Sequence, residues 1–416
     1  MTRFEYTHRK SERMYSRASS SVAGGIWGHN KYPGIDDFGS FPLFASRAKG
    51  AYFWDVDGNR YIDYLCGSGS MITGFANEKI DNSAIQEMRQ GSNLSLAREA
   101  SHELAEKLQQ TILGADWVAY GRNGSDAVTI AVLIARAATG RRGVVSVEDS
   151  YHGSHFWCNW SNFGPGQNKH DSGLVRTFRW NDLDSVSDAV ERFSGDISSI
   201  LIPPFHHPIP GDSVLAAEGF FEGIQEIAAS NDCLIILDDI RAGFRTSLRG
   251  SHQAFGFRPH LMCYSKALAN THSLAVTCGV KELRSAAEEV FISGTYWNDS
   301  PSMKAAIANL ELMEQEGTVA VVKGLGEQLA TGLRLAAKSN GFKLRLGGIP
   351  AMPSVRIHGD SQDVLMRAFA VEMAALGSFV HPRHNWFLSS AHSTDDIETT
   401  IRHAHTAFEA IRGHRE

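Results

Sequence analysis

Two charged residues, Asp238 and Lys266, each follow an apolar run that predicts a buried strand. Leu-Ile-Ile-Leu at 234–237 precedes the pair Asp238 and Asp239, and Leu-Met-Cys-Tyr-Ser at 261–265 precedes Lys266. Charges in such places are costly unless they are paired or have a function. One chemistry uses both: the lysine forms a Schiff base with pyridoxal phosphate, and the aspartate keeps the pyridine nitrogen protonated. A helix cap or a surface turn is the simpler interpretation of either residue alone.

A third motif predicts an anion site. The short apolar run Trp117–Tyr120 precedes Asn-Gly-Ser-Asp-Ala at 123–127, and an apolar helix is expected over 127–138 with Ser125 as its N-cap. Free N–H groups and the positive end of the helix dipole bind anions at such a position. An ordinary capped helix is the alternative.

Strand and helix patterns alternate through the middle of the chain, which indicates an α/β fold with a mainly parallel sheet covered on both faces. Further strands are expected at 143–147, 197–202, 233–237, 262–265 and 274–280. Four polar residues follow predicted strand ends: Asn123, Tyr151, Asp238 and Lys266. Ligands of such sheets bind beyond the carboxyl ends of the strands, so these four side chains are expected to converge.

The ends of the chain predict a second, smaller unit. An Asp-Gly turn between the alternating runs at 52–56 and 61–64 predicts a β-hairpin. Helices mixed with short strands near the C-terminus are typical of a small α+β domain. We expect a large domain over residues 65–305 and a small domain formed by 1–64 and 306–416.

The composition is that of an ordinary globular enzyme. The chain has 416 residues, of which 43% are hydrophobic and 21% charged. Its formal net charge of −6 gives no basic surface for nucleic acid or anionic lipid. No apolar run approaches the length of a membrane span.

The five cysteines are scattered, odd in number and without Cys-x-x-Cys spacing, which favours reduced thiols in the cytoplasm. The first 17 residues are charged and predict no signal peptide. The adjacent residues His206 and His207 do not suit chelation of one ion, so no metal site is predicted.

These motifs, in this order, resemble the class III aminotransferase family of fold-type I pyridoxal-phosphate enzymes, in particular its glutamate-1-semialdehyde aminomutase branch. The likeness covers roughly residues 23–411. It rests on the hairpin at 55–64, Asn-Gly-Ser-Asp-Ala at 123–127, Tyr-His-Gly at 151–153, Leu-Asp-Asp-Ile-Arg-Ala-Gly-Phe-Arg at 237–245, and Ser-Lys-Ala-Leu-Ala-Asn at 265–270. The resemblance implies a seven-stranded, mainly parallel sheet in the large domain.

The resemblance also implies roles for residues around the cofactor ring. Lys266 would be the Schiff-base lysine, and Asp238 would contact the pyridine nitrogen. Tyr151 would stack on the ring with His152 beside it, and Ile240 would pack against the ring.

The cofactor phosphate would be held by Asn123, Gly124 and Ser125. In the family, a Gly-Thr pair reaches the phosphate from the neighbouring subunit. Thr295 follows Gly294 in a matching pair, which implies a homodimer.

The substrate pocket departs from that of the aminomutase. Lys31 stands in place of its carboxylate-binding arginine, His384 in place of a glutamate, and Ser68 in place of a tryptophan. These departures argue against the aminomutase's own activity. The candidate substrate residues are Trp27, Lys31, Cys66, Ser68, His207 and His384.

Transamination between an amine or amino-sugar-like substrate and a keto or aldehyde acceptor is the expected function, in secondary metabolism of the aminoglycoside-tailoring kind. An isomerase, either an aminomutase or an epimerase with Cys66 as a second base, is the alternative, although a buried spectator cysteine is the simpler interpretation. The third possibility is a cofactor-binding regulator or an NAD oxidoreductase that shares only the sheet. The sequence shows neither the helix-turn-helix segment of such a regulator nor the dinucleotide-binding motif of such an oxidoreductase.

Overall fold

The computed structural model describes residues 6–26, 41–155, 157–158, 171–208 and 211–415. The chain forms two compact units. The terminal unit comprises residues 1–77, 210–212 and 320–416, and the sheet unit comprises residues 78–209 and 213–319. The domain division at 64/65 and 305/306 stays a prediction. Among the described residues, no helix is both long and apolar enough to cross a membrane.

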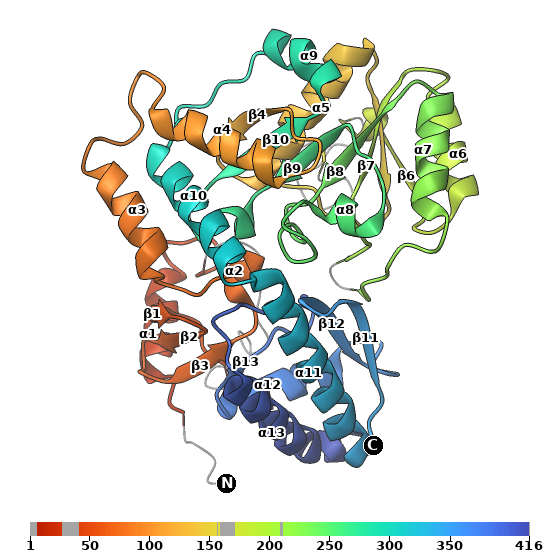
Figure 1. The fold of residues 1–416 in the computed structure, drawn as a ribbon. Coiled ribbons are helices and arrows are strands. Elements are labelled where there is room, and N and C mark those ends of the chain that lie inside the picture. Colours follow the sequence, from red (N-terminus) through yellow and green to blue (C-terminus); the bar gives the residue numbers. More distant parts are fainter. Residues whose placement is uncertain (1–5, 27–40, 156, 159–170, 209–210, 416) are drawn as a thin grey trace. The chain divides into compact units, whose positions relative to one another are not determined.

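A seven-stranded sheet organises the sheet unit (Figure 1). The strands lie in the order β4 (Trp117–Gly121), β10 (Ala275–Gly279), β9 (Leu261–Tyr264), β8 (Leu234–Asp238), β7 (Ile197–Ile202), β5 (Gly143–Val147) and β6 (Val175–Phe178). Neighbouring strands from β9 to β6 are parallel, whereas β10 runs antiparallel to both β9 and β4. The predicted mainly parallel, seven-stranded sheet is therefore confirmed.

Helices of the sheet unit are α3 (Glu78–Met88), α4 (Glu99–Thr111), α5 (Gly124–Thr139), α6 (Leu183–Glu191), α7 (Phe220–Ser230), α8 (Ser251–Phe255), α9 (Arg284–Glu289) and α10 (Ser300–Gln315). Helix α5 packs across β4 and β7 to β10, so it covers the middle of the sheet. Helices α3 and α4 pack on α10.

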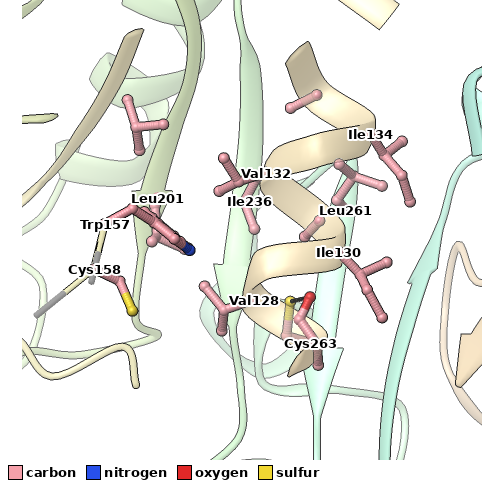
Figure 2. Packing of buried hydrophobic residues seen from close by; sticks show 14 of the residues in the cluster. Val128, Ile130, Val132, Ile134, Trp157, Cys158, Leu201, Ile236, Leu261 and Cys263 are labelled. Carbon is pink, nitrogen blue, oxygen red and sulfur yellow. Dashed lines mark hydrogen bonds between the residues drawn. The ribbon is translucent and has the colours of Figure 1, made fainter. Parts of the chain in front are cut away.

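The core of the sheet unit surrounds α5 (Figure 2). Val128 and Val132, one helical turn apart, point to one side of the helix, and Ile130 and Ile134 point to the other. Strand residues that complete this cluster include Leu201, Ile236, Leu261 and Cys263. A helix that is apolar nearly all round is typical of a buried position, and this packing holds the first turn of α5 in place.

The start of α5 differs from the prediction. Its N-cap is Asn123, not Ser125, because the Asn123 side-chain oxygen accepts a hydrogen bond from the Ser125 N–H at 3.0 Å. The carboxylate of Asp126 turns back to accept from the Asn123 N–H at 3.0 Å, which completes a capping box. Ser125 therefore lies within the first turn, and its hydroxyl is not used for capping.

The terminal unit contains a four-stranded sheet, β1 (Ala45–Lys49), β2 (Tyr52–Asp55), β3 (Arg60–Asp63) and β13 (Ser378–Phe379), and a two-stranded sheet, β11 (Leu344–Ile349) and β12 (Met352–Ile357). Strands β2 and β3 pair antiparallel, so the predicted hairpin is confirmed. The helices are α1 (Arg9–Ala18), α2 (Cys66–Gly69), α11 (Thr318–Ser339), α12 (Val364–Ala375) and α13 (Thr394–Ala410).

Candidate active site

A cavity of about 360 Å³ lies at the carboxyl ends of the parallel strands in the sheet unit. Its lining is drawn from the segments that follow β4, β5, β7, β8 and β9: Asn123, Gly124, Ser125, Tyr151, His152, Gly153, Ser154, His207, Asp238, Ile240, Arg241, Ser265 and Lys266. The four polar residues that were expected to converge all line it. This is the position at which ligands bind in parallel sheets.

Lys266 follows β9 in an unusual backbone conformation. Its φ is +50°, in the left-handed region that β-carbon-bearing residues seldom adopt. Such conformations cluster at functional sites, where the surrounding structure holds them in place. Burial and, to a smaller extent, the nearby charge of Arg241 lower the pKa of the Lys266 amine to about 7. A lysine amine that is partly uncharged near neutral pH can attack a carbonyl carbon.

Asp238 ends β8, and its carboxylate faces the cavity with 7% of the residue exposed. One carboxylate oxygen lies 2.6 Å from His152 Nδ1, and the other accepts a hydrogen bond from the Ile240 N–H at 3.1 Å. These two contacts orient the carboxylate. His152 Nε2 is buried and has no hydrogen-bond partner among the described residues.

Asp239 points elsewhere. Its carboxylate accepts hydrogen bonds from the Ser251 N–H at 2.8 Å and the Ser251 hydroxyl at 2.6 Å. Burial raises the pKa of this carboxyl to about 7. Asp239 does not line the cavity, so of the two adjacent acids only Asp238 can meet a ligand there.

The first turn of α5 and the segment after β5 form a narrow part of the cavity. A β-carbon on Gly124 would lie 2.9 Å from Ile240 Cδ1, and one on Gly153, at φ +130°, would lie 2.6 Å from Ser125 Oγ. Ser125 Oγ accepts a hydrogen bond from the Ser154 N–H at 3.0 Å. Glycine is thus required at position 153, and a side chain at position 124 would displace Ile240. The Ser125 hydroxyl lies at the N-terminus of α5, a position that suits an anion.

Four lining residues were not among the predicted site residues: Gly153, Ser154, Arg241 and Ser265. Arg241 is 6% exposed, and its Nη1 donates to His207 Nδ1 and to the His207 carbonyl, both at 3.0 Å. The signal for Arg241 in the sequence was its place in the Asp-Asp-Ile-Arg motif, four residues beyond the predicted strand end at residue 237. The side chain of an arginine at this position can lie either beside the strand end or in solvent, and the sequence alone does not distinguish these two locations.

The remaining predicted site residues are not among those that line the cavity. Thr295 lies on an exposed loop of the sheet unit. Ser68 and His384 belong to the terminal unit. Trp27 and Lys31 lie outside the described residues. Substrate roles for these residues stay predictions.

Cys66 is the first residue of the short segment α2, whose backbone is left-handed at Gly67 and Ser68. It is fully buried with φ +50°, and its thiol donates to the carbonyls of Asp63 and Phe387, each at 3.3 Å. A thiol with two backbone acceptors is well accommodated as a structural residue. This geometry does not favour its use as a second base.

Comparison with known proteins identifies the family. The model of the class III aminotransferases matches residues 36–385. An aminopentol aminotransferase from Sphingopyxis macrogoltabida is 31% identical over 402 residues, covering 95% of this chain and 93% of the relative. A 3-aminobutyryl-CoA aminotransferase from Cloacimonas acidaminovorans is 31% identical over 401 residues, covering 94% and 95%. The glutamate-1-semialdehyde aminomutase of Archaeoglobus fulgidus is 26% identical over 419 residues, covering 94% and 97%.

A solved structure agrees with this result. The FumI protein of Sphingopyxis sp. MTA144, in its pyridoxal-phosphate-linked internal aldimine form, superposes with a TM-score of 0.93 at 31% identity, covering 97% of this chain and 96% of that one. The predicted resemblance to the family and to its aminomutase-containing branch is confirmed, and two aminotransferases share more identity with the chain than the Archaeoglobus aminomutase does.

The cavity suits pyridoxal 5′-phosphate, the cofactor of this family. It offers a lysine of lowered pKa for an aldehyde, one oriented carboxylate for a ring nitrogen, and a glycine-lined helix N-terminus for a phosphate. Its volume of about 360 Å³ is enough for a small cofactor. The chain therefore belongs to the class III aminotransferase family and is a pyridoxal-phosphate-dependent aminotransferase that acts on a small-molecule amine.

Proposed function

We propose that the amino donor is a hydroxylated or otherwise carboxylate-poor primary amine, such as an amino polyol or amino sugar, and that the acceptor is a keto acid or aldehyde. The observation that carries the chemistry is the cavity that gathers Lys266, Asp238 and the start of α5. The names of the two similar aminotransferases indicate their substrates. In one the amino group is carried by a pentol, and in the other by the third carbon of a butyryl-CoA thioester. Lys31, where the aminomutase has a carboxylate-binding arginine, supports the same substrate class.

When bound, pyridoxal phosphate supplies an aldehyde that receives the amino group and a ring that withdraws electrons from the carbon bearing it. Lys266 holds the cofactor covalently between turnovers. Once displaced by the substrate amine, its uncharged Nζ would remove a proton from the amine-bearing carbon and return it to the carbon that was the aldehyde of the cofactor.

Asp238 and His152 act on the cofactor ring through charge and hydrogen bonding. The Asp238 carboxylate would hold the proton of the ring nitrogen, and His152, at 2.6 Å, orients the carboxylate. Ile240 and Tyr151 would pack against the ring. Support for these roles comes from the presence of all four side chains in the lining of one cavity.

The phosphate contacts of Asn123, Gly124 and Ser125 can be tested through Ser125→Ala. The loss of a hydrogen bond to a charged group costs about 1.5–3 kcal/mol, so the dissociation constant should rise by about 10-fold to 100-fold. Isothermal titration with pyridoxamine 5′-phosphate measures the constant without a covalent bond. Thr139→Ala, at the far end of α5, is the matched control. An unchanged dissociation constant in Ser125→Ala would show that the Ser125 hydroxyl does not bind the phosphate.

Transamination and isomerisation are separated by supplying one amine with no acceptor. A transaminase converts its cofactor to the pyridoxamine form and then stops, whereas an isomerase continues to form product. We expect one equivalent of product per site and loss of the visible absorbance band. The isomerase alternative would be supported by continued turnover that is lost in Cys66→Ala.

We propose that the protein is a homodimer in the cytoplasm. Phe291 is 89% exposed and Tyr296 65% exposed on the loop that carries Thr295, and Leu96 is 79% exposed on a second segment. Asn298 Nδ2 ties the two segments together by donating to the carbonyls of Leu94 at 3.2 Å and Leu96 at 2.9 Å. Large apolar side chains that are exposed on two segments connected by hydrogen bonds support an interface. Thr295 would reach the partner's cofactor phosphate from this surface.

Tyr296→Asp is expected to produce monomers in sedimentation measurements, because a charge would be buried in the interface. Thr295→Ala is expected to leave the dimer intact and to weaken binding of pyridoxamine 5′-phosphate by about tenfold, the effect of one lost hydrogen bond. A monomeric wild-type chain would contradict the dimer. A Thr295→Ala variant with unchanged affinity would contradict only the contact with the phosphate.

A further inference from the structure

The guanidinium of Arg241 lines the same cavity as Lys266 and Asp238, and the Asp238 carboxylate offsets part of its charge. The residue is 6% exposed, and the hydrogen bonds of its guanidinium within the described chain go to His207 alone. Burial lowers the pKa of Arg241 only to about 10, so the side chain stays charged at neutral pH. A buried cation held by neutral groups raises the local positive potential.

His207 fixes the position of this charge and adds none. Its Nδ1 accepts from Arg241 Nη1 at 3.0 Å, so the ring proton resides on Nε2. Burial lowers the pKa of His207 well below its usual value, and the adjacent guanidinium adds to the effect. The His207 carbonyl anchors the same nitrogen at 3.0 Å. The pair therefore carries a single positive charge through the physiological pH range.

The charges that face Lys266 do not balance. The negative charge of Asp238 favours the ammonium form of Lys266. Its two carboxylate oxygens already contact His152 and the Ile240 N–H. Arg241 and Arg245, from the turn after β8, both oppose a charge on the lysine, and Arg241 has the larger effect of the two. The other titratable groups that line the cavity are Tyr151, His152 and His207.

We propose that Arg241, held by His207, is a positioning residue that keeps Lys266 uncharged and nucleophilic whenever the lysine is not linked to the cofactor. The inference rests on the proposed role of Lys266. Only the uncharged amine has the lone pair that adds to the cofactor aldehyde, whose oxygen then leaves as water with the two hydrogens of the nitrogen. The same lone pair accepts the proton of the substrate carbon. Arg241 therefore acts through Lys266 and need not touch the reacting atoms.

The test measures the charge state of Lys266 directly. The full-length protein is loaded with pyridoxamine 5′-phosphate, which leaves the lysine unlinked, and is pulsed with acetic anhydride at a series of pH values. Acetylation of the Lys266 peptide is quantified by mass spectrometry. We expect the wild-type midpoint to lie well below that of an ordinary lysine, because burial lowers the pKa of Lys266. In Arg241→Met, the midpoint should rise by about one pH unit or more, because an opposing charge has been removed.

Arg241→Lys is the matched control, since it retains a positive charge, and its midpoint should stay near that of the wild type. A purely structural role would lower the melting temperature of Arg241→Met and leave its midpoint unchanged, and that result would overturn the proposal. If Arg241→Met does not fold, Arg241→Gln replaces it as the uncharged polar variant. A separate experiment tests the proposed function itself. If wild-type protein incubated with pyridoxal phosphate and borohydride carried no label at Lys266, the proposed function would be wrong, whatever the result for Arg241.

Discussion

Replacing Lys266 with alanine is expected to slow transamination by a factor on the order of 10⁴, because one substitution removes the covalent anchor and the group that moves the proton. The left-handed backbone at this position and the lowered pKa of about 7 indicate a site built for this amine. The rate should be measured in a single turnover by following the visible absorbance of the bound cofactor. Lys281→Ala, on the exposed surface of the sheet unit, is the matched control.

The cofactor should still bind to Lys266→Ala, through the phosphate site and Asp238, and borohydride should no longer attach it to the protein. Added methylamine is expected to restore part of the rate, since a small amine can take over the proton transfer. A variant that retains more than a tenth of the wild-type rate would show that another group moves the proton. A borohydride label on a different lysine would place the cofactor elsewhere.

Asp238→Asn is expected to lower the rate by about 10²-fold to 10³-fold, the usual cost of removing one preoriented charged group from an active site. An amide is nearly the same size as a carboxylate but cannot stabilise a proton on the ring nitrogen. The neighbouring Asp239→Asn makes the same chemical change on a side chain that bonds Ser251 and does not line the cavity. It should leave the rate of the chemical step nearly unchanged.

A cofactor analogue methylated at the ring nitrogen separates electronic from structural effects of Asp238→Asn. Such a ring is permanently charged and does not need the carboxylate to keep a proton. The analogue should therefore restore much of the activity of Asp238→Asn. If the variant is slow with both cofactors and unfolds at lower temperature, the carboxylate acts mainly through the fold, and its assignment to the ring nitrogen is wrong.

Asp238 and Arg241 have opposite effects on the charge of Lys266. Burial, which has the largest effect, and Arg241 favour the uncharged amine, whereas Asp238 favours the ammonium ion. In the proposed mechanism, the uncharged lysine acts as a base while Asp238 keeps the ring nitrogen protonated.

The sequence by itself determined the fold class, the family and the main chemistry. Apolar runs of strand length that end in Asp238 and Lys266 could be recognised because buried strands require continuous hydrophobic residues, and a charge at their end is conspicuous. The hairpin could be predicted for the same reason, because its Asp-Gly turn depends only on a few neighbouring residues. Interactions between residues close in the chain leave their pattern in the sequence itself.

Only the tertiary structure shows why Asp238, the predicted one of the two adjacent acids, faces the cavity, and what Arg241 contacts. Asp238 and Asp239 are chemically identical, and their directions differ because one lies beside His152 and the other beside Ser251. The N-cap of α5 was assigned to the wrong residue for a related reason, because Asn123 and Ser125 both suit a cap and the carboxylate of Asp126 settles the choice. Arg241 meets His207, 34 residues earlier in the chain, through the pairing of β7 with β8. Contacts of this kind arise when distant segments pack together, so no local pattern in the sequence records them.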